Sequence, residues 1–145
     1  MSIPITHMQS GQVLDLGSGA ALEVLSESAR GAVLLLSWEN FRLLLPNGAN
    51  FEDIETLQPN TAMRNMTAVL LAESGYAPLN PPGLIDHLHP QLALLSVAPA
   101  DRDGLPSPET MQALEGYNLL RTDENGWIEI TTNGEQLWVE VEKNP

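Results

Sequence analysis

The sequence predicts an α/β fold in which a mixed β-sheet is layered with flanking helices. Three observations lead to this class. Strand patterns fill the chain from Gln12 to about residue 45, strands and helices then alternate, and a strand pair ends the chain. Strands that alternate with helices favour parallel pairing, whereas strands joined by short turns favour antiparallel pairing. Both kinds of connection occur here, so the sheet should be mixed.

The first predicted elements are three strands. Residues 21–27 alternate apolar and polar side chains, which is typical of a strand with one buried face. Two apolar runs follow, 33–36 and 41–45, and the polar turn 39–40 between them predicts a β-hairpin. Proline, asparagine and glycine at 46–48 end the second strand of this hairpin.

A short helix over 50–57 and a buried strand over 67–72 come next. Asn50 can cap the helix by accepting a backbone N–H, and the acidic pair 52–53 suits the positive charge of the first turn. Residues 58–66 lie between these two elements and are predicted to form a loop or a single turn of helix.

The second helix is predicted to begin at Asn80, with Pro81 in the first helical position. Pro90 blocks its continuation because proline cannot donate a helical hydrogen bond. The strand 91–98 follows as a continuous apolar run. Such a run suits a sheet that is covered on both faces.

The third predicted helix carries the clearest helix signals in the chain. Ser107 caps it, Pro108 opens it and Gly116 ends it. Asn125-Gly126 and Asn133-Gly134 are strong two-residue turn signals. These turns predict three strands in the tail: 117–122, 126–132 and 135–142.

The length of 145 residues suits a single domain. We expect this domain over 12–142, with a flexible N-terminus at 1–11 and a short tail at 143–145. The absence of cysteine excludes thiol nucleophiles, thiolate metal sites and disulfides. No apolar run approaches the roughly 20 residues that span a bilayer, and the start lacks the segments of a signal peptide. We therefore expect a soluble domain that does not insert into a membrane.

The chain is strongly acidic, with a formal net charge of −13 and six Lys and Arg residues in total. Nucleic-acid binding normally requires clustered basic side chains that release counterions from phosphates. The charge therefore argues against direct nucleic-acid binding by this chain alone. Its ordinary consequence is solubility.

Four stretches in the chain resemble one known domain in their order and spacing. They are "GAVLLLSWENFRLLLPNG", "HPQLALLSVA", "LPSPETMQAL" and "LLRTDENGWIEITTNG". The most specific pieces are Arg121-Thr122-Asp123 followed by Gly126, and the strand that ends in Ser96-Val97. Together they resemble the C-terminal part of the metallo-β-lactamase-like domain of ComEC-family competence proteins. The resemblance covers most of the chain, and it implies the C-terminal half of an αββα sandwich.

The chain departs from this family at the positions of the metal site. The family's glycine-aspartate pair matches Asn47 and Gly48, so the carboxylate is missing. Its double histidine with glycine and serine matches "ESGY", which is Glu73, Ser74, Gly75 and Tyr76. Its glycine-histidine-proline matches Gly104, Leu105 and Pro106. The family's first metal motif lies in an N-terminal half that this chain does not contain.

The positions that hold or approach metal in the family are thus Gly48, Ser74 and Leu105, and none is a good metal ligand. The resemblance therefore implies a retained fold with no catalytic residue, no bound metal and no cofactor. It also implies a structural or interaction role in DNA uptake, attached to a bacterial inner-membrane channel. The alternatives are a fragment of a metal-dependent hydrolase or nuclease acting on phosphodiesters, and a small acidic interaction module.

A half-sandwich would expose one apolar face of its sheet. A large exposed apolar face on a soluble domain usually marks an interface. We therefore expect a protein partner at that face, either a second copy of the chain or the rest of a parent protein.

Several other residues could carry chemistry, but each has a simpler structural interpretation. Asp86, His87 and His89 could bind zinc, yet helical residues two apart point in different directions. His7 lies in the N-terminal stretch, away from other ligands. Asp101 and Asp103, next to Gly104, suggest a calcium loop, but the remaining ligand spacing is missing.

Three further groups have equally simple interpretations. Glu73 and Asp53 could form a carboxylate pair for acid–base work, but a solvated loop acid explains Glu73 equally well. Ser74 could be a nucleophile, although no base is evident. Trp38, Trp127 and Trp138 could stack on bases, but basic neighbours are lacking, so hairpin pairing or core packing is expected. Arg121-Thr122-Asp123 should form a local turn contact.

Overall fold

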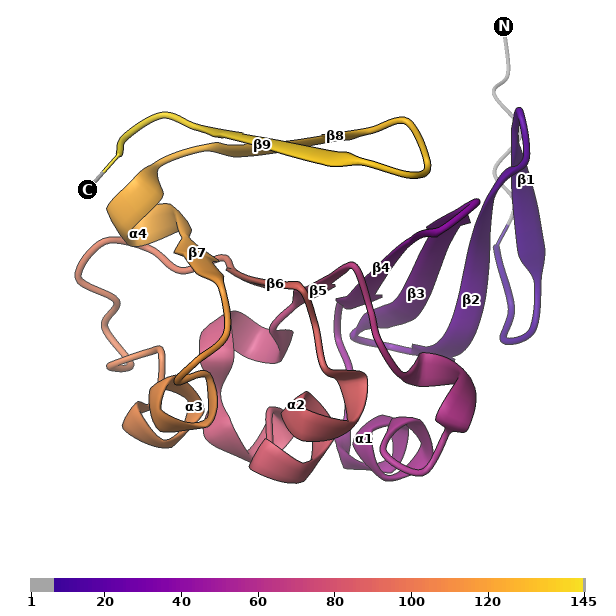
Figure 1. Ribbon diagram of the computed structural model, residues 1–145. Helices are drawn as coiled ribbons and strands as arrows, with labels where there is room; N and C mark the ends of the chain where they lie inside the picture. Colours follow the sequence, from indigo (N-terminus) through magenta and orange to yellow (C-terminus); the bar gives the residue numbers. More distant parts are fainter. Residues whose placement is uncertain (1–6, 145) are drawn as a thin grey trace, which may run out of the picture.

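The computed structural model describes residues 7–144 and has the predicted α/β architecture (Figure 1). A seven-stranded mixed sheet forms the central layer, and helices cover one of its faces. A two-stranded ribbon lies on the opposite side. The predicted fold class is therefore confirmed.

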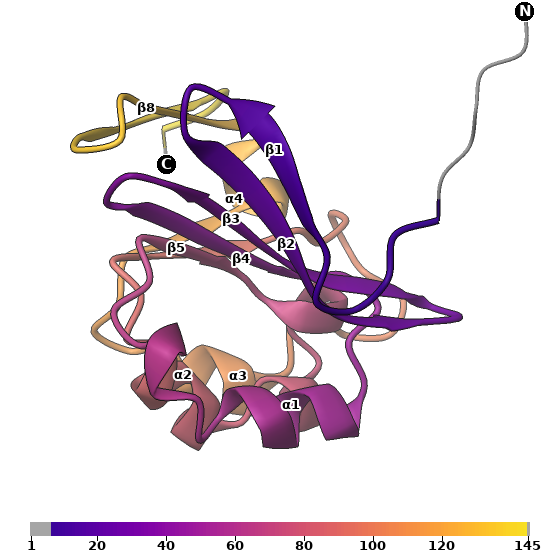
Figure 2. The same ribbon diagram turned by 90° about the vertical axis from the view of Figure 1, so that its right-hand side faces the viewer.

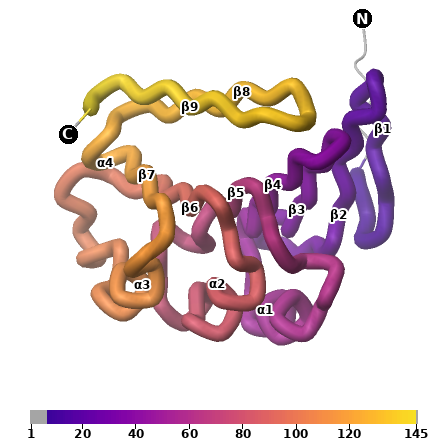
Figure 3. Tube along the Cα trace, viewed as in Figure 1, coloured from indigo at the N-terminus to yellow at the C-terminus, as the bar shows by residue number. Residues whose placement is uncertain are grey.

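Each strand of the large sheet pairs with its neighbour in the sequence, and Figure 3 allows this order to be followed along the chain. The first four strands are antiparallel, namely β1 (Val13–Gly17), β2 (Ala20–Ser28), β3 (Gly31–Trp38) and β4 (Phe41–Pro46). The next three continue parallel to β4, namely β5 (Ala68–Leu70), β6 (Leu92–Leu95) and β7 (Leu119–Arg121).

Three α-helices connect the parallel strands, namely α1 (Phe51–Leu57), α2 (Pro82–Leu88) and α3 (Pro108–Ala113). Parallel crossovers are almost always right-handed. Because successive crossovers here step in one direction along the sheet, their helices fall on the same face, as Figure 2 shows. Short 3₁₀ turns complete the connections, namely η1 (Thr61–Met63), η2 (Ala72–Gly75) and η3 (Ala77–Leu79).

The N-terminal caps of these helices match the sequence expectations only in part. Asn50 caps α1 as predicted, and it forms a reciprocal capping box with Asp53. Asn80 does not cap α2, which begins one residue later than expected, after Pro81. Ser107 occupies the cap position of α3, but its hydroxyl accepts a hydrogen bond from the Ala77 N–H instead. Both polar side chains serve a loop described below.

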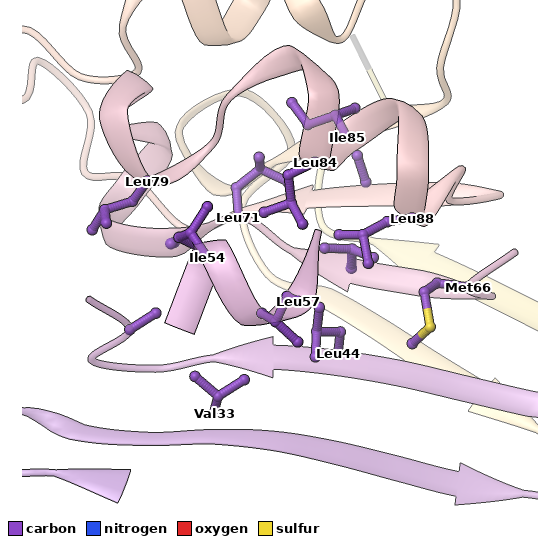
Figure 4. Packing of buried hydrophobic residues seen from close by; sticks show 14 of the residues in the cluster. Val33, Leu44, Ile54, Leu57, Met66, Leu71, Leu79, Leu84, Ile85 and Leu88 are labelled. Atoms are coloured by element: carbon purple, nitrogen blue, oxygen red, sulfur yellow. The ribbon is translucent and has the colours of Figure 1, made fainter. Parts of the chain in front are cut away.

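The hydrophobic core lies between the sheet and the three helices (Figure 4). Side chains from β3 and β4, such as Val33 and Leu44, meet Ile54 and Leu57 of α1. Leu84, Ile85 and Leu88 of α2 close the centre of this layer. All seven side chains are at most 5% exposed, so this half of the molecule is tightly packed.

The tail forms a ribbon of β8 (Ile128–Thr132) and β9 (Leu137–Val141), joined by the predicted Asn133-Gly134 turn. The prediction of a second hairpin at Asn125-Gly126 is wrong. That segment ends α4 (Thr122–Asn125), where the Asn125 Oδ1 accepts the Arg121 N–H at 2.9 Å. This side-chain bond closes a helical turn, so β7 and β8 belong to different sheets.

The second face of the large sheet carries a row of leucines, one on each of five neighbouring strands. Leu34 pairs with Leu45, Leu70 with Leu94, and Leu94 with Leu120. The register of β4 with β5 places Leu45 beside Leu70. Side chains alternate across a sheet, and the intervening residues pack against the helices. We call Leu34, Leu45, Leu70, Leu94 and Leu120 the leucine row; all five are only partly buried.

Arg121 and Asp123 form the local contact that the sequence predicts at this turn. The guanidinium donates to both carboxylate oxygens, at 3.1 and 2.6 Å, and both side chains are less than one-fifth exposed. Thr122 adds two bonds to the backbone of Val97, at 2.9 and 2.8 Å. These contacts attach α4 and the ribbon to the end of the sheet.

Replacing Asp123 with asparagine is expected to lower the free energy of unfolding by about 2 kcal/mol at pH 7. Hydrogen bonding and charge from Arg121 lower the pKa of the Asp123 carboxyl, although burial opposes them. A carboxyl group with a lowered pKa stabilises the fold above its unfolded-state pKa, and this contribution is lost as the pH falls through the folded-state value. The difference between variant and wild type in urea unfolding should therefore shrink below about pH 4. A difference that does not change with pH would contradict this assignment.

Candidate functional site

A cleft opens at the edge of the sheet where the parallel strands β4, β5 and β6 end. Ligands of open α/β sheets usually bind at such carboxyl ends. The cleft has a volume of about 560 Å³, and its lining includes Arg30, Glu73, Ser74, Tyr76 and Leu105. An adjoining pocket shares Glu73 and Ser74, and adds Asn47, Gly48 and Ser96 among others.

The structure thus brings together most of the positions that the resemblance assigns to the family's metal site. Gly48 and Ser74 line one pocket, while Ser74 and Leu105 line the other. Gly75 lies beneath them, because a Cβ there would be 2.8 Å from the Pro106 Cβ and 2.9 Å from Leu95. Gly104 is the exception, since it lies in an exposed loop outside both lining sets.

The loop after β5 has a strained backbone. Glu73, Ser74 and Gly75 have φ angles of 42°, 52° and 84°. Residues other than glycine rarely adopt this left-handed backbone region. Each non-glycine residue held there costs roughly 1–3 kcal/mol of folding free energy. Strain of this kind persists only where the surroundings hold the segment in place.

Three polar side chains hold this loop. Asn80 is 4% exposed; its Oδ1 accepts the Ala72 N–H at 2.9 Å, and its Nδ2 donates to the Ala72 and Tyr76 carbonyls. From the other side, Thr110 Oγ1 and the Ser107 N–H donate to the Gly75 carbonyl, at 2.8 and 3.1 Å. The Ser107 hydroxyl also accepts the Ala77 N–H at the end of this loop, at 3.1 Å. Because the Asn80 and Ser107 side chains bind the loop, neither caps its helix.

Gly48 lines a pocket, and it also allows two backbone turns to approach closely, which the sequence does not reveal. Its φ is +72°, and a Cβ at this position would lie 2.5 Å from the carbonyl oxygen of Arg30. The close approach of two backbone turns therefore requires glycine at this position. An aspartate at this position therefore does not fit the backbone.

Two oppositely charged side chains of the cleft pair with each other. Glu73 pairs with Arg30 at 3.2 Å, and both side chains are more than one-third exposed. In the described part of the chain, no histidine lines either pocket. Among residues 7–144, no three His, Asp or Glu side chains converge as a metal site would require.

The other candidate ligands make contacts with protein groups: His87 with Asn60, and both His89 and Asp86 with Tyr117. The His87 Nε2 lies 2.7 Å from the Asn60 carbonyl oxygen, and the His89 ring packs edge-on against Tyr117. Asp86 accepts a hydrogen bond from the Tyr117 hydroxyl, which contributes to the raised pKa of Tyr117 after the larger effect of burial. His7 is exposed.

The acidic candidates are also engaged in local structure. The Asp101 Oδ1 accepts the N–H groups of Asp103 and Leu105, at 2.9 and 3.1 Å, and so closes its own loop. Asp53 belongs to the capping box of α1. The structure therefore assigns backbone-capping roles to both carboxylates.

The tryptophans take part in strand pairing. Trp38 lies opposite Phe41 in β3 and β4, and Trp138 lies opposite Thr131 in the ribbon. Trp127 precedes β8, and its carbonyl accepts the Glu142 N–H at 3.0 Å. Trp127 and Trp138 are 52% and 48% exposed, so hairpin pairing rather than core packing describes them.

Sequence reasoning missed Arg30, Phe51, Asn80 and Thr110 at this site. Arg30 and Phe51 line the cleft, and Asn80 and Thr110 hold its loop. Only the buried environment of Asn80 and Thr110 distinguishes them from ordinary surface polar residues, and that environment depends on tertiary contacts. No protein-family model, curated protein or solved structure matches the chain.

Proposed function

We propose that the chain is a non-catalytic, metal-free interaction domain, related to the metallo-β-lactamase-like domain of ComEC-like competence proteins. In this proposal its role in DNA uptake is structural. The observation that carries it is the cleft at the carboxyl ends of the strands, where Gly48, Ser74 and Leu105 supply no metal ligand.

Two further observations support the proposal. Buried hydrogen bonds from Asn80 and Thr110 hold the loop after β5 that lines the cleft. This supports a fold that has been kept without its metal chemistry. The leucine row leaves a partly exposed apolar face opposite the helices, and such faces usually serve as interfaces. No helix in residues 7–144 combines the length and apolar character that crossing a bilayer requires.

Metal content tests this proposal directly. The chain is purified without chelator, zinc and manganese are assayed by mass spectrometry, and both metals are then titrated calorimetrically. We expect far less than one metal per chain and no tight binding. Near-stoichiometric metal that is lost in a Glu73→Gln or Asp101→Asn variant would contradict the proposal, and would assign a metal to the cleft. Metal lost only in a His87→Ala, His89→Ala variant would place it at the end of α2.

A further inference from the structure

The β8 strand of the ribbon has a free edge. The Trp127 carbonyl accepts the Glu142 N–H, and the Asn133 N–H donates to the Gln136 carbonyl, so the backbones of Trp127 and Asn133 face β9. In an antiparallel pair the residues alternate between facing the partner and facing away. The backbone groups of Ile128, Ile130 and Thr132 therefore face away from β9. Within residues 7–144, no segment outside the ribbon bonds to them.

This free edge lies beside the leucine row. The tip of the ribbon is fixed by the Asn40 N–H, which donates to the Gly134 carbonyl at 3.0 Å next to the start of β4. Leu137 and Val139 of β9 line a groove with Leu92 and Leu119, at the start of β6 and β7, and with Leu120 of the leucine row. β8 follows α4, which begins at the carboxyl end of β7. β8 therefore lies toward the carboxyl ends of the strands, next to the rest of the leucine row.

The ribbon has one apolar side and one acidic side. Leu137 faces the sheet, and residues on the same side by alternation and pairing are Ile128, Ile130, Val139 and Val141. The outer side carries the pair Glu129 and Glu140, together with Thr131 and Trp138. Over residues 126–143 there are four glutamates and one lysine. A strand added to β8 would thus lie over the apolar leucine row on one side and next to Glu129 on the other.

We propose that the β8 edge and the leucine row together dock a β-strand from another protein, one that alternates apolar with basic residues. Its apolar side chains cover the leucine row, and its lysines or arginines lie beside Glu129. Backbone hydrogen bonds to Ile128 and Ile130 supply affinity, as in other strand-addition complexes. The inference rests on the proposed function, because it identifies the partner of that interaction domain.

Charge argues against a second copy of the chain as the occupant. Each copy carries a net charge of −13, and like charges brought together across an interface oppose association. A two-stranded ribbon is also marginally stable by itself. A third, basic strand would relieve the repulsion between Glu129 and Glu140 and cover the leucine row at once.

The test uses synthetic peptides and the full chain labelled for NMR. The probe is an eight-residue peptide that alternates valine with lysine. One control peptide has glutamate in place of lysine, and another has the same composition with valines and lysines in two blocks. At saturation we expect amide exchange at Ile128 and Ile130 to slow by at least about tenfold. Methyl signals of Leu45, Leu70 and Leu94 should shift, and neither control peptide should reproduce these effects.

A charge-reversed pair of variants tests the acidic side. Glu129→Lys should weaken binding of the valine-lysine peptide by about threefold to fivefold, as expected for an exposed cross-strand ion pair. Glu55→Lys is the matched control, since Glu55 is an exposed residue of α1 on the helical face and the net charge changes equally. The Glu55→Lys variant should bind the valine-lysine peptide with the same affinity as the wild type.

Five outcomes would overturn the inference. They are no binding of the valine-lysine peptide, equal binding of the glutamate peptide, equal binding of the block peptide, equal weakening by both variants, and dimers of the peptide-free chain that already protect Ile128 and Ile130. The last outcome would identify a second copy as the occupant. Metal content distinguishes the two proposals. A metal-free chain that does not bind the valine-lysine peptide contradicts only the docking inference. A metal-loaded chain that binds this peptide contradicts only the proposed function.

Discussion

Replacing Asn80 with alanine is expected to lower the free energy of unfolding by about 4 kcal/mol. The variant loses three hydrogen bonds, and it leaves the Ala72 N–H and the Ala72 and Tyr76 carbonyls without their partner. Each buried polar group without a partner costs about 1–3 kcal/mol. The strained loop at Glu73 and Ser74 loses a main support at the same time.

Urea unfolding measures this effect, and Asn118→Ala is the matched control. Asn118 is exposed and makes one side-chain bond, to the Gln91 carbonyl at 3.0 Å. Its replacement should cost about 0.5 kcal/mol. Hydrogen exchange adds a local readout, because the Ala72 and Tyr76 amides should exchange faster in the Asn80 variant. If the two variants have the same stability, Asn80 does not hold the cleft loop.

Gly48→Asp, which introduces the carboxylate of the family that the sequence resembles, is expected to destabilise the fold by about 3 kcal/mol. A side chain at this position meets the Arg30 backbone, and the left-handed φ adds a conformational cost. The substitution should therefore fail to create a metal site.

Gly104→Asp separates the two causes. Gly104 has a φ of +71°, nearly equal to that of Gly48, but a Cβ added at Gly104 would have open space within 4 Å. The added charge is also the same. We expect this control to cost only about 1 kcal/mol, the conformational part alone. Equal losses of stability in urea unfolding would show that the contact with Arg30 can relax.

Local chemistry made several elements predictable from the sequence. The alternation in 21–27 and the two apolar runs around Asn40 identified three of the four antiparallel strands, β2 to β4. Asn50 was a reliable cap because Asp53 could complete the reciprocal bond within four residues. Asn133-Gly134 formed the predicted hairpin because the strands on both sides of it, β8 and β9, pair with each other.

The failures occurred where a polar side chain found a distant partner. Asn80 and Ser107 had cap-like surroundings, but the loop after β5 used both side chains. Asn125-Gly126 looked like a hairpin turn, yet Asn125 bonded to Arg121 and closed a helical turn. For the candidate site, the resemblance pointed to positions 48, 73, 74 and 105, and these line the two adjoining pockets. The strain at Glu73 and the steric need for Gly48 depend on backbone approaches that local patterns do not encode.

The strand order has a consequence for how the chain folds. Every strand of the large sheet lies next to the one made just before it. Each antiparallel pairing therefore closes a tight turn, and each parallel pairing closes a single helical crossover. During synthesis, the edge of each finished strand is the template for the next strand to leave the ribosome. The sheet can therefore grow in step with translation, and the leucine row lengthens by one residue with each strand from β3 to β7.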